Sequence, residues 1–330
     1  MIGLSSRRCS HGYRGGFASY GATGNGGYGA SLGKQNAIYF EPVRDILLKS
    51  IKTIPIQEGH VFNIGDYGTA DGATSMTFMT DLLKVLQDHH GPGMEFRWLL
   101  LSGCPRHQLS YKDSLCIYPE SSDEEKEAMM KAGGEAWETF LVMRSKELIP
   151  GGILFVAVCC EYTDVSTGEQ TYTSKSFLLL ASRVWKAFRD SGKISDEEFI
   201  NTNFPIYLQT REQLTSPFND IISPVRRSGL QLLFSEVYIN ADVFYDDWMQ
   251  KKDKEGIDDR EEFARMYVAA HRNWGNSTFI NGLSDSRLQE EKEKIVDELF
   301  ATIEKHMTFI SPDEFKNNMG LTYLIIRKRA

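Results

Sequence analysis

The chain has 330 residues, of which 41% are hydrophobic and 25% are charged, and its formal net charge is -8. This composition is that of a globular protein with a substantial core, built as one large α/β domain with a smaller attachment or as two domains. An acidic chain without a basic block is a poor candidate for binding nucleic acid or an anionic membrane.

The sequence also bears on the compartment. It contains no run of apolar residues long enough for a transmembrane helix. Two arginines near the start have no apolar run behind them, which disfavours a secretory signal. Five irregularly spaced cysteines in a long chain favour free thiols in a reducing compartment. We therefore expect a cytoplasmic protein.

The first half of the chain alternates helical and strand patterns. Apolar residues recur at helical spacing from Gln35 onwards. A short apolar run then ends at Asp66 and is followed by a tight turn that carries glycines. In chain order we expect a glycine-rich segment at 1–33, a helix at 35–54, a strand at 60–66, a helix at 73–86, a loop at 88–93 and a strand at 96–102.

The second half contains longer elements. A strong helical pattern begins near Ser122 and ends at Leu148, where a Pro-Gly-Gly sequence stops it before a clean buried strand. We expect a helix at 122–148, a strand at 153–158, a helix at 174–190, a strand at 230–239, helices near 260–274 and 285–306, and a closing strand at 321–329.

The turn after the first strand carries the candidate chemistry. Ligands of doubly wound sheets bind beyond the carboxyl ends of the strands, where Asp66 and Gly68 are expected. The glycine spacing does not fit a dinucleotide fingerprint, and no phosphate-binding loop motif is present. A carboxylate in this turn suits a ligand with positive charge, such as the ammonium and sulfonium groups of S-adenosyl-L-methionine. The alternative is a glycine turn whose aspartate caps the following helix.

Motifs at both ends of the chain follow a specific order. They are Gly26-Gly27-Tyr28 with Gln35 seven residues after the tyrosine, Asp66-Tyr67-Gly68, the helix and strand from Trp137 to Val158 around Pro-Gly-Gly, Phe204-Pro205 with Tyr207, and the closing pattern from Glu298 to Arg329. In this order they resemble the plant-type salicylate, jasmonate and caffeine carboxyl methyltransferase family, including its animal and fungal relatives.

The resemblance implies an α/β fold with a Rossmann-like methyltransferase sheet, mostly parallel, and a helical cap. We expect this sheet to be incomplete. The resemblance also divides the chain. Residues 1–33 are the glycine-rich N-terminal segment, 34–190 are the first half of the methyltransferase-like core, and 191–330 supply the helical cap elements and the C-terminal strands of the core.

The same resemblance assigns site residues. Tyr28 is expected to help hold S-adenosyl-L-methionine, and Asp66, in the turn with Gly68, to contact its methionine part. Gln35 is expected to hydrogen-bond the carboxylate of the substrate. Trp98 corresponds to the tryptophan of a His-Trp pair that also contacts this carboxylate.

Two positions depart from the family pattern. Arg97 replaces the histidine of the His-Trp pair, and Leu32 stands where the family has a serine. The proposed chemistry nevertheless needs few groups, because a carboxylic acid is already ionised at pH 7 and requires no general base. Amide and indole N–H groups can orient the carboxylate for direct displacement. We therefore assign no residue as a catalytic acid, base or nucleophile.

Other reactive side chains have plainer interpretations. His89-His90 lies in the expected loop without a suitably spaced cysteine or carboxylate, so we predict no metal site there. Cys159-Cys160 ends a buried strand, and we expect both residues to be thiols of the core.

The stretch between Asp66 and Gly151 is short for the family. It leaves room for one strand where the family has three, and the segment that would bind the ribose hydroxyls has no match. We predict an S-adenosylmethionine-dependent methyltransferase that acts on a small-molecule carboxylic acid. The alternative is a non-catalytic or truncated relative that serves as a binding or dimerisation partner. A homodimer stays open, and no nucleic-acid or membrane partner is expected.

Overall fold

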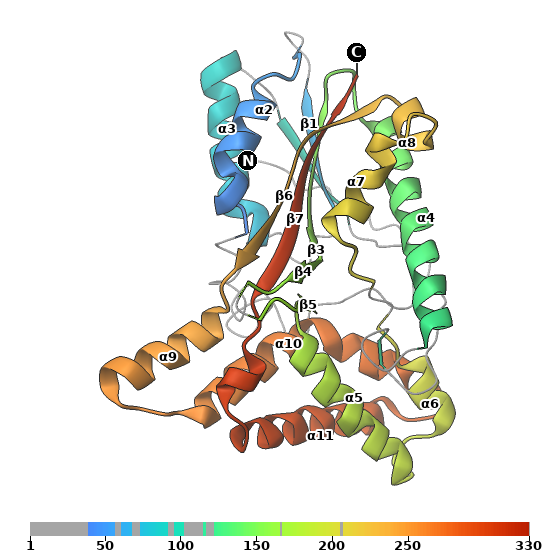
Figure 1. Ribbon diagram of the computed structural model, residues 1–330, viewed down its shortest axis with the longest axis vertical. Coiled ribbons are helices and arrows are strands. Elements are labelled where there is room, and N and C mark those ends of the chain that lie inside the picture. The colour runs from blue at the N-terminus through green and yellow to red at the C-terminus, as the bar shows by residue number, and fades with distance from the viewer. Residues whose placement is uncertain are drawn as a thin grey trace.

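The protein has a mixed α/β fold, as predicted. The computed structural model describes residues 39–56, 61–67, 73–91, 96–101, 115–116, 122–165, 167–204 and 207–329. Figure 1 shows strands with helices on both sides in its upper part and a layer of helices below them.

The helix expected from Gln35 begins later in the structure. A short 3-10 turn, η1 (Glu41–Val43), leads into α2 (Arg44–Ile51). Tyr39 and Phe40 are described and are not helical. Pro42 lies in the first turn of η1. Proline favours the start of a helix because it has no N–H to donate, which fits a helical start at Glu41.

The next three elements form a single β–α–β unit. Strands β1 (Phe62–Tyr67) and β2 (Phe96–Leu101) pair in parallel, and α3 (Ala73–His90) connects them. The structure corrects the loop expected at 88–93, because His89 and His90 belong to the last turn of α3. The helix ends at Gly91, whose φ of +101° is favourable for glycine.

Three further strands form an antiparallel sheet in the order β3-β7-β6. They are β3 (Ile153–Cys159), β6 (Leu230–Asn240) and β7 (Met319–Lys328). The expected sheet was mostly parallel, whereas among the described strands only β1 and β2 pair in that way. The cause is the path of the chain. Strands β3 and β6 run towards the helical layer, and β7 returns from it, so β7 must oppose both (Figure 1).

Helices cover both faces of this sheet. On one face, Leu324 and Ile326 of β7 share a cluster with Trp137 of α4 (Asp123–Glu147), and α7 (Arg211–Asn219) and α8 (Pro224–Arg227) add to it. On the other face, Ile325 packs in a cluster with Leu47 of α2 and Leu82 of α3. Successive residues of a strand point to opposite faces, so β7 contributes to both clusters.

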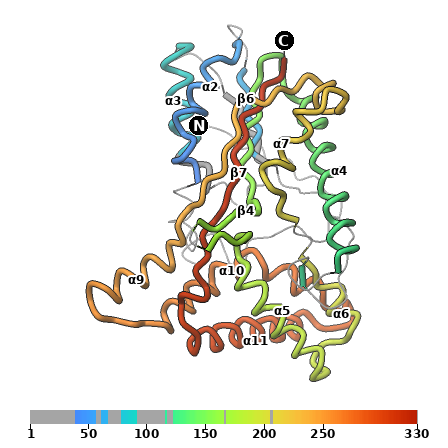
Figure 2. Tube along the Cα trace, viewed as in Figure 1, coloured from blue at the N-terminus to red at the C-terminus, as the bar shows by residue number. Residues whose placement is uncertain are grey.

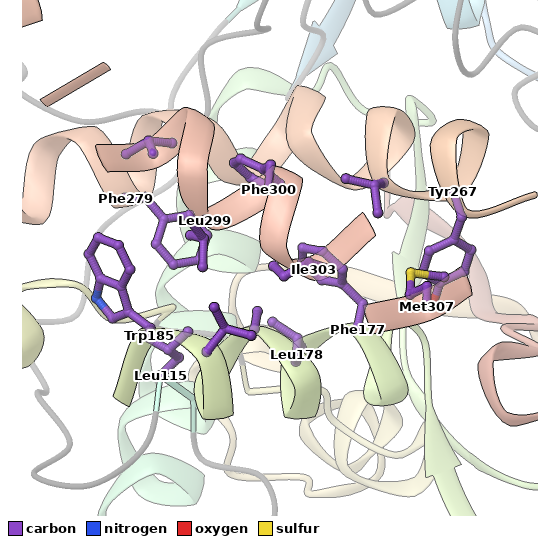
Figure 3. Close-up of a cluster of buried hydrophobic side chains, with 14 of the residues drawn as sticks. Leu115, Phe177, Leu178, Trp185, Tyr267, Phe279, Leu299, Phe300, Ile303 and Met307 are labelled. Carbon is purple, nitrogen blue, oxygen red and sulfur yellow. The ribbon is translucent and has the colours of Figure 1, made fainter. Parts of the chain in front are cut away.

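The helical layer has its own core. It contains α5 (Lys175–Asp190), α6 (Asp196–Asn201), α9 (Val243–Glu255), α10 (Arg260–Gly282) and α11 (Gln289–Thr308). Figure 3 shows Phe177 and Trp185 of α5 directed towards Phe300 of α11 and Phe279 of α10, and all four side chains are buried. The boundary predicted at residue 190 remains a prediction, although α5 packs with α10 and α11.

The remaining described elements lie where the strands meet the helices. Strands β4 (Glu161–Thr163) and β5 (Gln170–Tyr172) form a hairpin directly after β3, and η2 (Pro312–Phe315) precedes β7. The trace in Figure 2 passes from β5 into α5 and from β6 into α9, and it returns through η2 to β7.

We predict that Gly282→Ala destabilises the fold. A Cβ atom at this last residue of α10 would lie 2.8 Å from Cα of Thr202, a buried residue at the end of α6, so backbone would have to move. Overpacking of this kind typically costs about 1–3 kcal/mol. Urea denaturation of the variant measures the loss. The control is Gly134→Ala in α4, where a Cβ meets no atom within 4 Å and the free energy of unfolding should stay equal or rise.

We also predict a pH-dependent role for Glu198 in α6. Its buried carboxylate accepts hydrogen bonds from Nη2 of Arg287 at 2.9 Å and from the backbone N–H of Ser284 at 2.9 Å. The hydrogen bond from Arg287 is the main cause that lowers the pKa of Glu198 to about 2. Because this pKa is below its ordinary value of 4.5, the stabilisation is present above pH 4.5 and is lost as the pH falls towards 2.

The test compares Glu198→Gln with Glu197→Gln, an exposed neighbour in the same helical turn. At pH 7 the first variant should lower the free energy of unfolding by about 2 kcal/mol, because a neutral amide loses the charge-assisted hydrogen bond from Arg287, which keeps Glu291 as its other partner. The difference from the wild type should shrink as the pH falls below 4.5. An equal loss in both variants would contradict this account.

Candidate functional site

The first candidate residue, Asp66, lies where the sequence places it. It is the penultimate residue of β1, its side chain is half-buried, and the backbone register pairs it with Leu100 of β2. The carboxylate therefore stands at the carboxyl end of a parallel β–α–β unit, which is the end at which ligands bind in such sheets. A carboxylate in this position can accept hydrogen bonds from an ammonium group.

Trp98 lies in the middle of the neighbouring strand. Its backbone pairs with Ile64, two residues before the level of Asp66. A strand advances about 3.3 Å per residue, so the two Cα positions differ by roughly 7 Å along the strand direction. The structure thus brings Trp98 to the strand beside Asp66, and its contact with a substrate remains a prediction.

The other predicted site residues lie outside the described parts of the chain. These are Tyr28 and Gln35, which precede residue 39, and Gly68, which follows β1 directly. The prediction that Tyr28, Gln35 and Asp66 converge on one cleft therefore stays a prediction.

Two polar side chains lie where β3 ends: Glu161, which the sequence analysis did not name, and Tyr207, which it named only as part of a motif. Glu161 begins β4 and is half-buried, and burial raises the pKa of its carboxyl group. Tyr207 accepts a hydrogen bond from Nε2 of Gln213 at 2.8 Å. Burial raises the pKa of Tyr207, this hydrogen bond opposes the rise, and the nearby charge of Glu161 adds to it. The ring of Tyr207 packs where a side chain at Gly133 of α4 would stand. Glu161 carried no signal in the sequence, and the contact of Tyr207 with Gly133 can be found only once the fold is known.

The cysteines at the end of β3 are thiols of the interior, as expected. Cys160 is fully buried, and Cys159, the last residue of β3, is half-buried. Burial raises the pKa of Cys159 to about 11 and also raises that of Cys160. A thiol with a raised pKa is a poor nucleophile at neutral pH, because the thiolate is the reactive form.

Two further kinds of site are absent from the described part of the chain. No group of three or more histidine, cysteine, aspartate or glutamate side chains there could hold a metal ion. Within the same residues no helix is both long enough and apolar enough to cross a membrane.

Comparison with known proteins identifies the family. A solved structure described as a loganic acid methyltransferase with SAH has a similar fold, with a TM-score of 0.60 and 14% sequence identity, over 94% of this chain and 99% of that chain. No curated protein matches the chain in sequence. The profile of a family described as SAM dependent carboxyl methyltransferase matches residues 100–328. Since this match covers more than half of the sequence, the chain belongs to the S-adenosylmethionine-dependent carboxyl methyltransferases.

Proposed function

We propose that the chain transfers the methyl group of S-adenosylmethionine to the carboxylate of a small-molecule acid, with Asp66 on the cofactor side. The single observation that carries the residue assignment is the position of this carboxylate at the carboxyl end of β1, beside β2. The family match begins at residue 100, so it does not include Asp66. The name of the structural neighbour, a loganic acid methyltransferase, supports an acid as the acceptor class.

The site residues share the work as follows. Asp66 is half-buried and negatively charged, so it fits the ammonium group of the methionine part of the cofactor. We propose that Tyr28 and Gly68 complete this contact, and that Gln35 and Trp98 hold the acceptor carboxylate by donating N–H hydrogen bonds. When bound, S-adenosylmethionine supplies a methyl group that is open to direct displacement. The residues orient the acceptor oxygen and exclude water, and no residue needs to move a proton.

Location and assembly belong to the same proposal. The cysteine composition supports the cytoplasm, and the acidic net charge supports a protein without nucleic-acid or membrane partners. A homodimer remains an open assembly. The small-molecule acid is the partner that the family description supports.

We predict that S-adenosylmethionine binds weakly and that Asp66→Ala abolishes this binding. The segment that would carry an acidic partner for the ribose has no match in the chain. Each lost charge-assisted hydrogen bond costs on the order of 1.5–3 kcal/mol, which is a tenfold to hundredfold loss of affinity. Calorimetry on monodisperse protein measures the dissociation constant.

The control for this experiment is Asp45→Ala, which removes an exposed carboxylate of α2. It should bind the cofactor as the wild type does. Low-micromolar binding by the wild type would show that the ribose contact is intact. Unchanged binding by Asp66→Ala would place Asp66 outside the site. Methyl transfer to no acid in a broad panel would favour the non-catalytic relative.

We predict that Gln35→Ala raises the KM for the acceptor and leaves the affinity for S-adenosylmethionine unchanged. An amide N–H to a charged group contributes on the order of 1.5–3 kcal/mol, so KM should rise roughly tenfold or more. Transfer of a labelled methyl group to a panel of small acids at saturating cofactor gives KM. Gln35→Glu should be worse, because it sets a second negative charge against the acceptor. Weaker cofactor binding in either variant would assign Gln35 to the wrong ligand.

A further inference from the structure

Three connections between the strands and the helical layer meet at one buried place. Ser174 lies between β5 and α5, Asp242 lies between β6 and α9, and Asn317 and Asn318 lie between η2 and β7. Figure 2 shows the chain passing between the two layers at these connections. We call these four residues, with His271 of α10, the Asp242 junction.

The carboxylate of Asp242 joins two of the connections. Its Oδ1 accepts hydrogen bonds from the backbone N–H groups of Phe244 at 2.9 Å and Tyr245 at 3.2 Å, which caps the N-terminus of α9. Its Oδ2 accepts from the backbone N–H of Asn317 at 2.9 Å. In return, Oδ1 of Asn318 accepts from the backbone N–H of Asp242 at 3.3 Å. The end of β6 is thereby tied to the start of β7.

Asn317 extends the junction to the third connection. Its Oδ1 accepts from the backbone N–H of Ser174 at 2.5 Å. Ser174 has a φ of +67°, a conformation that costs energy for a residue with a side chain and persists only when the surroundings fix it. The Oγ atom of Ser174 lies 3.2 Å from Nε2 of His271, and Nδ1 of His271 lies 2.8 Å from the carbonyl oxygen of Tyr267. Helix α10 is therefore fixed to the same point.

The junction is buried, with 3% of Asp242 and 4% of His271 exposed to solvent. Burial lowers the pKa of His271 to about 4, so the imidazole is neutral near pH 7. Burial is also the largest influence on Asp242. It raises the pKa of this carboxyl group to about 6 against the opposing effect of the three N–H groups, and Asp246 of α9 adds to the rise.

Other titratable groups around the junction have partners or remain neutral. The hydroxyl of Tyr267 from α10 is buried, and its pKa is raised well above the ordinary value. Tyr245 of α9 donates its hydroxyl hydrogen to Asp313 of η2, and Nζ of Lys316 lies 4.8 Å from the centre of the Tyr245 ring. Asp242 is thus the group of the junction that changes charge near pH 6.

We propose that Asp242 is a positioning residue for methyl transfer, because its carboxylate ties two connections together, Asn317 links them to the third, and the helical layer is thereby fixed against the end of the strands. This inference rests on the proposed function. In that function the cofactor lies at the carboxyl end of β1, and the present proposal adds that the acceptor lies between the strands and the helical layer. Asp242 touches neither ligand, and it acts through the placement of the helices. Misplacement of reacting groups by about 1 Å can cost a hundredfold in rate.

The proposal has a consequence for pH. A proton on Oδ2 removes the acceptor for the N–H of Asn317 and loosens the junction. The folded pKa of Asp242 is above the ordinary value of 3.8, so its contribution to stability is fully present below that value and is lost as the pH rises through about 6. Protonation therefore adds to the overall stability of the folded protein and weakens only the hydrogen bond from Asn317. A small carboxylic acid stays ionised above pH 5, and the displacement uses no base.

The decisive variant is Asp242→Asn. Its side-chain oxygen can still cap α9, because asparagine is a good N-cap residue, but its NH2 group cannot accept from Asn317. The matched control is Asp259→Asn, which changes another aspartate cap, at the start of α10, that accepts from the backbone N–H of Glu262 at 2.8 Å. This second cap joins no connection between the layers.

The kinetic measurement is labelled-methyl transfer to a small acid at several pH values, with cofactor binding followed by calorimetry. For the wild type, the acceptor KM should rise as the pH falls through about 6. For Asp242→Asn, KM should be raised about tenfold at pH 7.5 and be flat from pH 5 to 8, as expected for one lost hydrogen bond to a charged group. Cofactor affinity should stay within about twofold in both variants. A KM inflection near pH 6 that persists in Asp242→Asn overturns the proposal, and so does an equal effect of Asp259→Asn.

Amide hydrogen exchange on the same proteins needs no turnover. The amides of Asn317 and Ser174 should exchange faster in Asp242→Asn than in the wild type, whereas those of Phe244 and Tyr245 should be unchanged. If this pattern is found and no acid is methylated, the proposed function fails while the junction stands. If the Asn317 amide is as protected in the variant as in the wild type, the carboxylate does not hold the connections and the proposal is wrong.

Discussion

The structure depends above all on the burial of β7 on both faces. From Leu321 to Ile326 its side chains are at most 2% exposed, and it pairs with β3 on one side and β6 on the other. Full burial of one large aliphatic side chain contributes about 1.5–3 kcal/mol, and this strand buries several in succession. The cluster that joins α4, α7 and α8 to one face of the sheet and the cluster that joins α2 and α3 to the other face each contain residues of β7. The strand comes last in the sequence, so the sheet is completed only when the far end of the chain returns.

The direction of β7 also determines how the strands connect to the helical layer. Strand β7 starts at the helical layer, and β3 and β6 end there, so each connection carries backbone out of the sheet and into a helix. Backbone N–H and carbonyl groups at such exits lose their sheet partners and must be satisfied in another way when they are buried. Asp242, Asn317 and Asn318 supply those partners with short side chains. The polar residues at the exits are thus a direct consequence of burying a central strand between two layers.

The spacing of hydrophobic residues predicted the long helices and strands, because each of them buries side chains on one face or on both faces. The helical pattern that begins near Ser122 corresponds to α4 in the structure, and the apolar run from Ile153 corresponds to β3. The hairpin of β4 and β5 and the helices α6 to α9 were not predicted, because three to nine residues give too little periodicity in most of them. Two of these helices did carry a readable start signal. Ser195 with Glu198, and Thr210 with Gln213, form capping boxes in the structure.

The candidate site was predicted only as far as local sequence determines position. Asp66 could be placed because an apolar strand followed by a glycine turn fixes where its carboxylate stands. The parallel pairing of β1 with β2, which brings the backbone of Trp98 beside Ile64, depends on a helix crossover and not on either strand alone. The Asp242 junction joins residues that are more than 70 positions apart, and Asp242 alone reads as an ordinary helix cap. No local pattern reports such a contact, because it exists only after β6 and β7 have paired.

Asp66 lies at a strand end, and Asp242 lies in a connection between the layers. This difference suggests how the family reaction can depend on distant parts of the chain. A group that binds the cofactor at a strand end is rigid, because the strand and its neighbour hold the backbone on both sides. The helical layer, which the proposal assigns to the acceptor, is joined to those strands through the three connections described above, and the hydrogen bonds there fix its position. Direct displacement requires three atoms to be nearly in line, so error in the helical layer weakens catalysis even when both ligands are bound. The proposed role of Asp242 therefore makes the precision of methyl transfer depend on the buried polar exits as well as on the residues that touch the ligands.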